Sequence, residues 1–209
     1  MSKKNWVHRQ RQDPYVKQAQ EQGWRARSAF KLLELDDTEK LFDNAKRVVD
    51  LGAAPGAWCQ VARARCRSQS QVYALDVLEM APIEGVVFVQ GDFREPEVLT
   101  AFEDALRGSG AGEKVDLVLS DMAPNISGIG PSDQAKSMDL AELALAFAHD
   151  WLHTQGVFVV KVFQGAGFDA FLTELRRSFQ SVKSKKPKAS RAESREMYLV
   201  ARGLNTTAS

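Results

Sequence analysis

The sequence predicts a single-domain α/β fold in which a mostly parallel, seven-stranded sheet is covered by helices on both faces. Segments that are apolar on both faces alternate with amphipathic segments, which is typical of parallel strands and their connecting helices. The chain has 209 residues, 44% of them hydrophobic and 26% charged, which suits one globular core. The last two strand-like segments are joined without a helix, so one of them is expected to run antiparallel.

The first half of the chain opens with two short helices, expected at 15–22 and 28–42, of which the second has a broad apolar face. A buried strand follows at 47–51 and ends in the glycine-rich turn Gly52-Ala-Ala-Pro-Gly56, from which a helix continues through about Cys66. This half is completed by strands at 72–76 and 86–89 and a helix at 95–107.

The second half continues the same alternation. A strand at 115–120 precedes a long helix at 133–152, and a strand at 157–162 leads through the turn Gly165-Ala-Gly167 into a helix at 168–179. The last two strands are joined by a short linker that contains a proline, and they are expected near 180–184 and 196–201. We therefore divide the chain into a basic N-terminal extension with a short helix, one main domain and a disordered tail, at 1–27, 28–203 and 204–209.

Composition also limits where the protein acts. No segment approaches the ~20 apolar residues needed to cross a bilayer, and the start of the chain lacks the apolar stretch of a signal peptide. We expect a cytoplasmic monomer without a membrane segment. Cys59 and Cys66 lie on one expected helix, about 10 Å apart along its axis, which is too far for a disulfide. Both are expected to be reduced thiols.

The net charge of +1 hides a strong segregation of charge along the chain. Residues 1–31 carry a net charge of +6 and residues 176–202 carry +7, whereas the rest of the chain carries −12. Basic segments that flank an acidic core are typical of nucleic-acid contact, because Lys and Arg neutralise phosphates. Two solvated basic tails are an equally good interpretation from charge alone. The segment 183–195 contains no aromatic residue, which favours phosphate contact over base stacking.

Each of the first four expected strands ends on or beside an acidic residue, namely Asp50, Asp76, Asp92 and Asp121. Ligands of open α/β sheets bind at the carboxyl ends of the strands, so these residues indicate the chemistry of the ligand. The acidic charge is wrong for a phosphate-bearing ligand, and the glycine-rich turn matches neither dinucleotide nor nucleoside triphosphate motifs. One such acid is more often a helix N-cap, but four together favour a ligand site.

These acids suit S-adenosylmethionine, which carries a sulfonium, an amino group, ribose hydroxyls and an adenine amine. Gly52 and Gly56 allow the backbone to approach such a ligand closely. Asp76 lies 20 residues after Gly56, about where dinucleotide-binding folds place the acid that binds ribose hydroxyls. We expect Asp76 and Asp92 to bind this cofactor.

Six segments of the chain also match one enzyme family, in order and without large gaps: Phe30-Lys31-Leu32, Asp50 to Trp58, Val89 to Phe93, Ser120 to Asn125, Val160 to Gly165 and Ser190 to Glu196. They resemble the FtsJ/RlmE family of S-adenosylmethionine-dependent ribosomal RNA ribose 2′-O-methyltransferases. The resemblance implies a Rossmann-like methyltransferase fold. It also implies a set of cofactor-binding residues, namely Gly52, Pro55, Gly56, Trp58, Asp76, Asp92 and Asp121. The family has a second glycine where this chain has Ala57, which is tolerable if the φ of Ala57 is negative.

The resemblance further implies a catalytic tetrad of Lys31, Asp121, Lys161 and Glu196. Judged from the residues alone, Lys161 is the most informative, because it interrupts an apolar strand where an unpaired ammonium would be very costly. Lys161 must therefore be paired or lie near the open end of the strand. A purely structural ion pair is an equally good interpretation. Lys31 and Glu196 by themselves also fit a solvated helix residue and an edge charge.

The implied substrate is a uridine ribose in the A-loop of large-subunit (23S) ribosomal RNA, on the assembled 50S subunit or a late precursor. The same tetrad serves transfer RNA and messenger-cap ribose methyltransferases, and the compact chain favours the ribosomal branch. The alternative from another class is a non-catalytic RNA-binding assembly factor. His149 and His153 are spaced i, i+4 on the long expected helix, but no third ligand follows, so no metal is expected.

Overall fold

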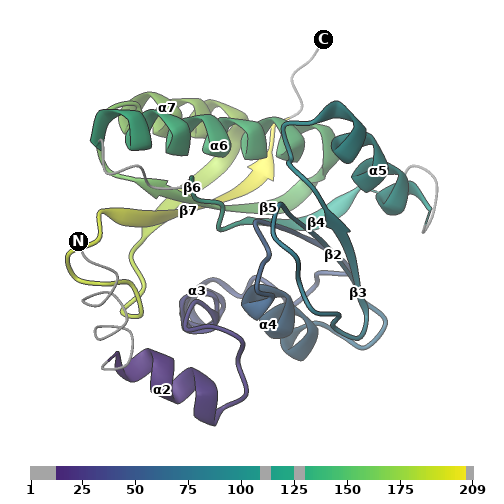
Figure 1. Cartoon of the computed structure of the whole chain (residues 1–209). Coiled ribbons are helices and arrows are strands. Elements are labelled where there is room, and N and C mark those ends of the chain that lie inside the picture. The colour runs from purple at the N-terminus through teal and green to yellow at the C-terminus, as the bar shows by residue number, and fades with distance from the viewer. Residues whose placement is uncertain (1–12, 109–113, 125–129, 206–209) are drawn as a thin grey trace.

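The computed structural model describes residues 13–108, 114–124 and 130–205 (Figure 1). In the described part of the chain two helices precede the first strand, and two strands follow the last helix. In chain order the elements are α2 (Pro14–Glu21), α3 (Ala29–Glu39), β1 (Arg47–Leu51), α4 (Ala57–Arg65), β2 (Gln71–Asp76), β3 (Val86–Gln90), α5 (Pro96–Arg107), β4 (Val115–Ser120), α6 (Gly130–Trp151), β5 (Leu152–Phe163), α7 (Phe168–Ser178), β6 (Phe179–Lys185) and β7 (Glu196–Leu204).

One seven-stranded sheet forms the centre of the molecule, with the strand order β3-β2-β1-β4-β5-β7-β6. The strands from β3 to β5 pair in parallel, whereas β7 is antiparallel to both β5 and β6. The predicted antiparallel strand near the C-terminus is therefore confirmed. The strand order reverses between β1 and β4, so the carboxyl ends of these two strands mark the place where an open α/β sheet binds ligands.

Helices cover both faces of the sheet (Figure 1). α5, α6 and α7 lie on one face, α3 and α4 lie on the other, and α2 packs on the outside of α3. Successive strand side chains point to opposite faces, so Val48 packs in the α3–α4 layer and Val49 in the α5–α7 layer. Coverage on both faces is the reason why the inner strands are apolar throughout.

Several element boundaries differ from the sequence prediction: α3 ends at Glu39 and not at 42, and α6 begins at Gly130 and not at 133. Two further differences change the interpretation. β5 begins at Leu152, which is buried and pairs with Val115, so His153 lies on a strand and not on the helix that carries His149. β7 continues to Leu204, which is buried and pairs with Phe179. The predicted disordered tail at 204–209 therefore starts too early, while residues 206–209 lie outside the described part of the chain.

Both cysteines are free thiols, as predicted: Cys59 is buried in α4, and Cys66 is half-buried at its end. No helix in the described part of the chain combines the length and apolar character that crossing a membrane requires.

Candidate active site

The glycine-rich turn connects β1 to α4 at the carboxyl edge of the sheet, and its shape depends on two glycines. Gly52 has a φ of +81°, and a Cβ there would lie 2.9 Å from the backbone of Met122. Gly56 has a φ of +103° and forms the N-cap of α4. Among the described non-glycine residues only Lys40 has a positive φ, so Ala57 satisfies the condition for replacing the family's second glycine.

Asp76 and Asp92 lie at the same edge but differ in what they bind. The Asp76 carboxylate accepts hydrogen bonds from the backbone N–H groups of Ala54, at 2.9 Å, and Leu78, at 2.8 Å. It therefore fixes the glycine-rich turn to the end of β2. Asp92 accepts bonds from the Arg94 side chain and backbone at 2.6 to 3.0 Å, and these bonds lower the pKa of the Asp92 carboxyl to about 2.

Trp58 and Pro55 occupy different parts of this region. The Trp58 side chain is buried in the α3–α4 layer, where its indole N–H donates to the carbonyl of Ser28 at 2.9 Å. Its ring centroid lies 5.8 Å from that of Tyr198. The structure thus places Trp58 beneath the glycine-rich turn, inside the core, whereas Pro55 lies in the turn itself and accepts a hydrogen bond from Arg25.

Asp50 is fully buried on β1, two residues before the turn. One of its carboxylate oxygens accepts a hydrogen bond from the Cys59 thiol at 3.1 Å, and the other has no hydrogen-bond partner among the described residues. Burial raises the pKa of the Asp50 carboxyl to about 7, and the nearby carboxylates of Asp121 and Asp76 act in the same direction. Asp50 is thus a core residue behind the site, and not one of the acids on the surface of the site.

On the other side of the sheet's switch point, Lys161 and Asp121 form a buried ion pair. The Lys161 ammonium lies 3.0 Å from the Asp121 carboxylate and donates to the Asp121 carbonyl at 2.5 Å. Lys161 is 8% exposed, so both conditions set by its position in an apolar strand are met: it is paired, and it lies near the strand's carboxyl end.

Lys31 and Glu196 form a second ion pair beside the first. Lys31 lies in the first turn of α3, and its ammonium is 2.6 Å from the Glu196 carboxylate at the start of β7. Both side chains are largely buried, at 13% and 11% exposure, which excludes the interpretation of Lys31 as a solvated helix residue.

Tyr198 connects the two ion pairs, and sequence analysis missed it. Its hydroxyl donates to the Asp121 carboxylate at 2.8 Å, and the Lys31 ammonium lies 5.7 Å from the centre of its ring. Burial, together with the carboxylates of Asp121 and Glu196, raises the pKa of Tyr198 well above its ordinary value, so the phenol stays a donor. The period of two along β7 was the available signal, because it puts Tyr198 on the same face as Glu196.

The antiparallel pairing of β7 with β5 explains how these residues meet. Tyr198 is directly opposite Lys161, and Glu196 is opposite Phe163. Residues opposite each other in an antiparallel pair share a face, so Lys161 and Tyr198 both point into the α3–α4 layer, where Lys31 arrives from α3. The structure thus brings together all four residues of the implied tetrad.

The described part of the first basic flank, residues 13–31, lies beside the loop that joins β6 to β7, at the end of the molecule that carries α2 (Figure 1). Arg27 forms an ion pair with Asp13 and donates to the carbonyl of Ala189. Glu34 on α3 accepts hydrogen bonds from the backbone N–H groups of Lys188 and Ala189 at 2.6 and 3.0 Å. The segment 186–195, which we call the basic loop, is therefore fixed to α3 and to the start of α2.

Two of the lysines before this loop have partners within the chain. Lys183 and Lys185 lie 2.9 and 2.6 Å from the Glu39 carboxylate at the end of α3. Burial alone would raise the pKa of the Glu39 carboxyl, but its bonds with Lys185 and Lys183 outweigh burial and lower it. These two lysines therefore hold α3 against β6, whereas Lys186 and Lys188 have no ion pair in the described part of the chain.

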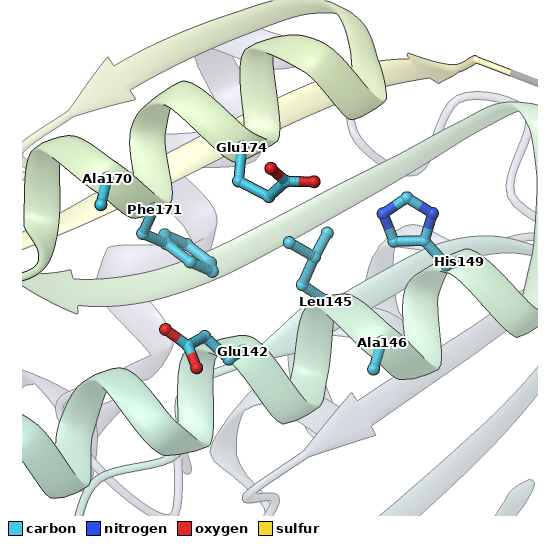
Figure 2. A pocket seen from close by; sticks show the side chains of 7 residues that line it. All are labelled: Glu142, Leu145, Ala146, His149, Ala170, Phe171 and Glu174. Carbon is cyan, nitrogen blue, oxygen red and sulfur yellow. The ribbon is translucent and has the colours of Figure 1, made fainter. Parts of the chain in front are cut away.

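A hollow of about 440 Å³ lies apart from these residues, between α6 and α7 on the opposite face of the sheet (Figure 2). Glu142, Glu174 and the exposed His149 surround it. His149 contacts Ser178 at 3.0 Å, while His153 contacts Asp116 at 2.9 Å, so the expectation that the two histidines share a helical face is wrong. Among the described residues no three metal-binding side chains gather at one point.

Comparisons with known proteins agree with this geometry. Residues 24–204 match the model of the family described as FtsJ-like methyltransferase. The chain is 52% identical over 197 residues to "Ribosomal RNA large subunit methyltransferase E" of Methylobacillus flagellatus, covering 94% of this chain and 93% of the relative. It is 53% identical over 197 residues to the protein of the same name from an Azoarcus species, covering 94% of each chain.

Among solved structures, one from Plasmodium falciparum described as a ribosomal RNA methyltransferase shares 31% identity and a TM-score of 0.76, covering 87% of this chain and 98% of its own. The family model spans the glycine-rich turn, both ion pairs and the basic loop. This chain belongs to the FtsJ-like methyltransferase family.

Proposed function

We propose that the protein transfers a methyl group from S-adenosylmethionine to a ribose 2′-hydroxyl of large-subunit ribosomal RNA. This proposal depends on one observation. Two ion pairs, Lys161–Asp121 and Lys31–Glu196, lie beside the glycine-rich turn and are connected by Tyr198. An RNA-binding protein without catalysis has no need to bury two lysines at this edge, because a buried charge is costly even when paired.

The residues present fit S-adenosylmethionine. Gly52 and Gly56 themselves add no side chain to the turn, and Asp76 fixes the turn through one bond per carboxylate oxygen. Each carboxylate oxygen can accept a second bond, so Asp76 retains acceptors for ribose hydroxyls. When bound, the cofactor supplies a methyl group on a positively charged sulfur, and the acidic edge favours that charge.

Methyl transfer breaks the sulfur–carbon bond, forms an oxygen–carbon bond and releases the hydroxyl proton. Asp121 accepts two of the three N–H donors of a Lys161 ammonium, which leaves the third to bind the 2′-oxygen and orient it. Alternatively, a neutral Lys161 removes the proton as a general base. Lys31 and Glu196 hold α3 and β7 around this lysine, and Tyr198 holds Asp121 in place.

The RNA substrate follows from two further observations. The closely similar relatives are named for large-subunit ribosomal RNA. The basic loop, which is fixed to α3 and leads into Glu196, also carries Lys186 and Lys188, neither of which has an ion pair in the described part of the chain. Phosphate neutralisation by such lysines supplies most of the affinity for nucleic acid. Within this class we propose a uridine of the A-loop, on the assembled 50S subunit or a late precursor, acted on by a cytoplasmic monomer.

The test maps ribose methylation across all RNA in cells with the protein, without it, and with Lys161→Ala in its place. We expect one large-subunit site to lose its methyl group in the last two strains. Loss at a transfer RNA or messenger-cap site would identify a different acceptor. The non-catalytic alternative would be favoured if the methylation map were the same in all three strains, while ribosome assembly were altered only in the strain without the protein and normal with the wild type and with Lys161→Ala. Purified protein with radiolabelled cofactor then compares bare RNA with 50S subunits.

A further inference from the structure

Arg25, in the segment between α2 and α3, joins the glycine-rich turn to the loop after β2. We call the part of the sheet's carboxyl edge that these two loops and Asp76 border the cofactor edge. Its guanidinium donates to the carbonyl of Pro55 in the glycine-rich turn at 3.1 Å. The same group donates to the carbonyls of Ala81 and Pro82, in the loop after β2, at 2.6 and 2.9 Å. We propose that Arg25 is a positioning residue that sets the distance between these loops, and thereby the affinity for the cofactor.

The chemistry of the contacts explains why an arginine is needed. Pro55 and Pro82 have no backbone N–H, so the loops have few donors with which to bind each other. A guanidinium presents five N–H donors in one plane and can bind three separated carbonyls, whereas an ammonium presents its donors at a single point. No ion pair in the described part of the chain includes Arg25, although this edge is rich in acids. Its donors serve backbone carbonyls.

The surroundings of Arg25 fix it in this position. Its own backbone N–H donates to the Gln60 side chain at 2.8 Å, and Gln60 in turn donates to the carbonyl of Gly23 at 3.1 Å. A Cβ on Gly56 would lie 2.8 Å from the Arg25 guanidinium. Gly56 is thus required for its backbone conformation and also for the space that Arg25 occupies.

This proposal rests on the proposed function, because it assumes that S-adenosylmethionine binds between these loops. It predicts an effect on cofactor affinity and not on methyl transfer once the cofactor is bound. It also predicts that S-adenosylmethionine and S-adenosylhomocysteine weaken equally, because loop spacing does not depend on the methyl group. If the positive charge of Arg25 acted directly on the sulfonium, its removal would instead favour S-adenosylmethionine over the neutral product.

The experiment measures calorimetric Kd values of both ligands for the wild type, Arg25→Met, Arg25→Lys and the control Arg63→Met. Arg63 also binds a carbonyl, that of Ser70 at 2.6 Å before β2, and its guanidinium lies beside Gly85, where the loop after β2 ends at β3. We expect about a tenfold or larger rise in both Kd values for the two Arg25 variants, with an unchanged ratio and an unchanged single-turnover rate at saturation. Arg63→Met should bind like the wild type.

Backbone hydrogen exchange without any ligand separates this proposal from the proposed function. Amides of the glycine-rich turn should exchange faster in Arg25→Met than in Arg63→Met at equal unfolding midpoint. Wild-type cofactor affinity in Arg25→Met, or a loss of RNA affinity alone, would overturn the positioning role. A wild type that binds no S-adenosylmethionine, with the exchange difference present, would instead contradict the proposed function and leave the loop contact standing.

Discussion

Two parts of the carboxyl edge of this sheet are built in opposite ways. One is the cofactor edge, and the other, which we call the acceptor edge, consists of Lys31, Asp121, Lys161 and Glu196. At the cofactor edge, Asp76 binds backbone amides of its own and the neighbouring loop, and Asp92 binds a residue two positions away. At the acceptor edge, Lys31 and Glu196 come from distant parts of the chain and neutralise each other. At the cofactor edge, carboxylates hold the backbone of the loops in shape. At the acceptor edge, the strands and α3 hold charged side chains in place.

This difference separates the consequences of mutation. Changes at the cofactor edge should alter ligand affinity through the shape of a loop and leave the chemical step alone. Changes of Lys31, Lys161 or Glu196 at the acceptor edge should alter the chemical step and leave cofactor affinity alone, because these charged groups are held by α3, β5 and β7. A mutation that changed both properties equally would show that the two edges are not independent.

The largest effect is expected for Lys161. Lys161→Ala should lose at least ~100-fold in single-turnover rate, the scale of a positioned acid–base group, with nearly normal binding of S-adenosylmethionine. Lys161→Arg keeps the charge but cannot release a proton at working pH. Rapid-quench kinetics on both variants distinguishes the roles: substantial activity of the arginine variant excludes a general base, and substantial activity of the alanine variant contradicts the assignment.

Asp76 should give the matching effect at the cofactor edge. Asp76→Ala removes a charged acceptor and both amide bonds, so cofactor affinity should fall by roughly tenfold to a hundredfold, or about 1.5 to 3 kcal/mol. Asp76→Asn keeps the volume and one oxygen and should lose less. Calorimetry on folded protein measures both. Equal affinity in wild type and Asp76→Ala would refute a role for this acid.

Tyr198→Phe should have a smaller effect, confined to the acceptor edge. It removes one hydrogen bond to Asp121 while the ion pair with Lys161 remains, which is worth about 1 kcal/mol, or roughly a fivefold loss of single-turnover rate. Cofactor Kd should stay the same. If the rate were unchanged while the unfolding midpoint fell, Tyr198 would be only a packing residue.

The smallest effect concerns RNA affinity. It should differ between two pairs of lysines, of which one pair forms ion pairs within the chain and the other forms none in its described part. Changing Lys186 and Lys188 to Gln should reduce the salt dependence of RNA binding by up to about 0.7 to 0.9 per lost phosphate contact. Changing Lys183 and Lys185 to Gln should reduce it less and instead lower stability, since Glu39 loses its partners. Titrations at several salt concentrations test this, and equal slopes for all proteins would exclude the surface.

The parts of the site that the sequence predicted are those carried by contiguous segments. The glycine-rich turn and Asp76 follow from strand and turn patterns, and the mostly parallel pairing of the strands follows from their alternation with helices. The period of two along β7 could have placed Tyr198 on the face of Glu196, but its bond to Asp121 depends on the register of β7 against β5. The Glu39 pairs could not be predicted, because they depend on the register of β6 and on the approach of α3. His153 was misplaced because early pairing of Leu152 with Val115 ended the helix.

The buried carboxyl of Asp50 couples folding of the chain to the uptake of a proton. Its folded pKa of about 7 lies above its ordinary value of 3.8, so between these values the folded chain holds a proton that the unfolded chain releases. This contribution to stability is fully present at low pH and is lost as the pH rises toward 7. Refolding near pH 6 should therefore withdraw a proton from the buffer, and the heat of refolding should depend on which buffer supplies it.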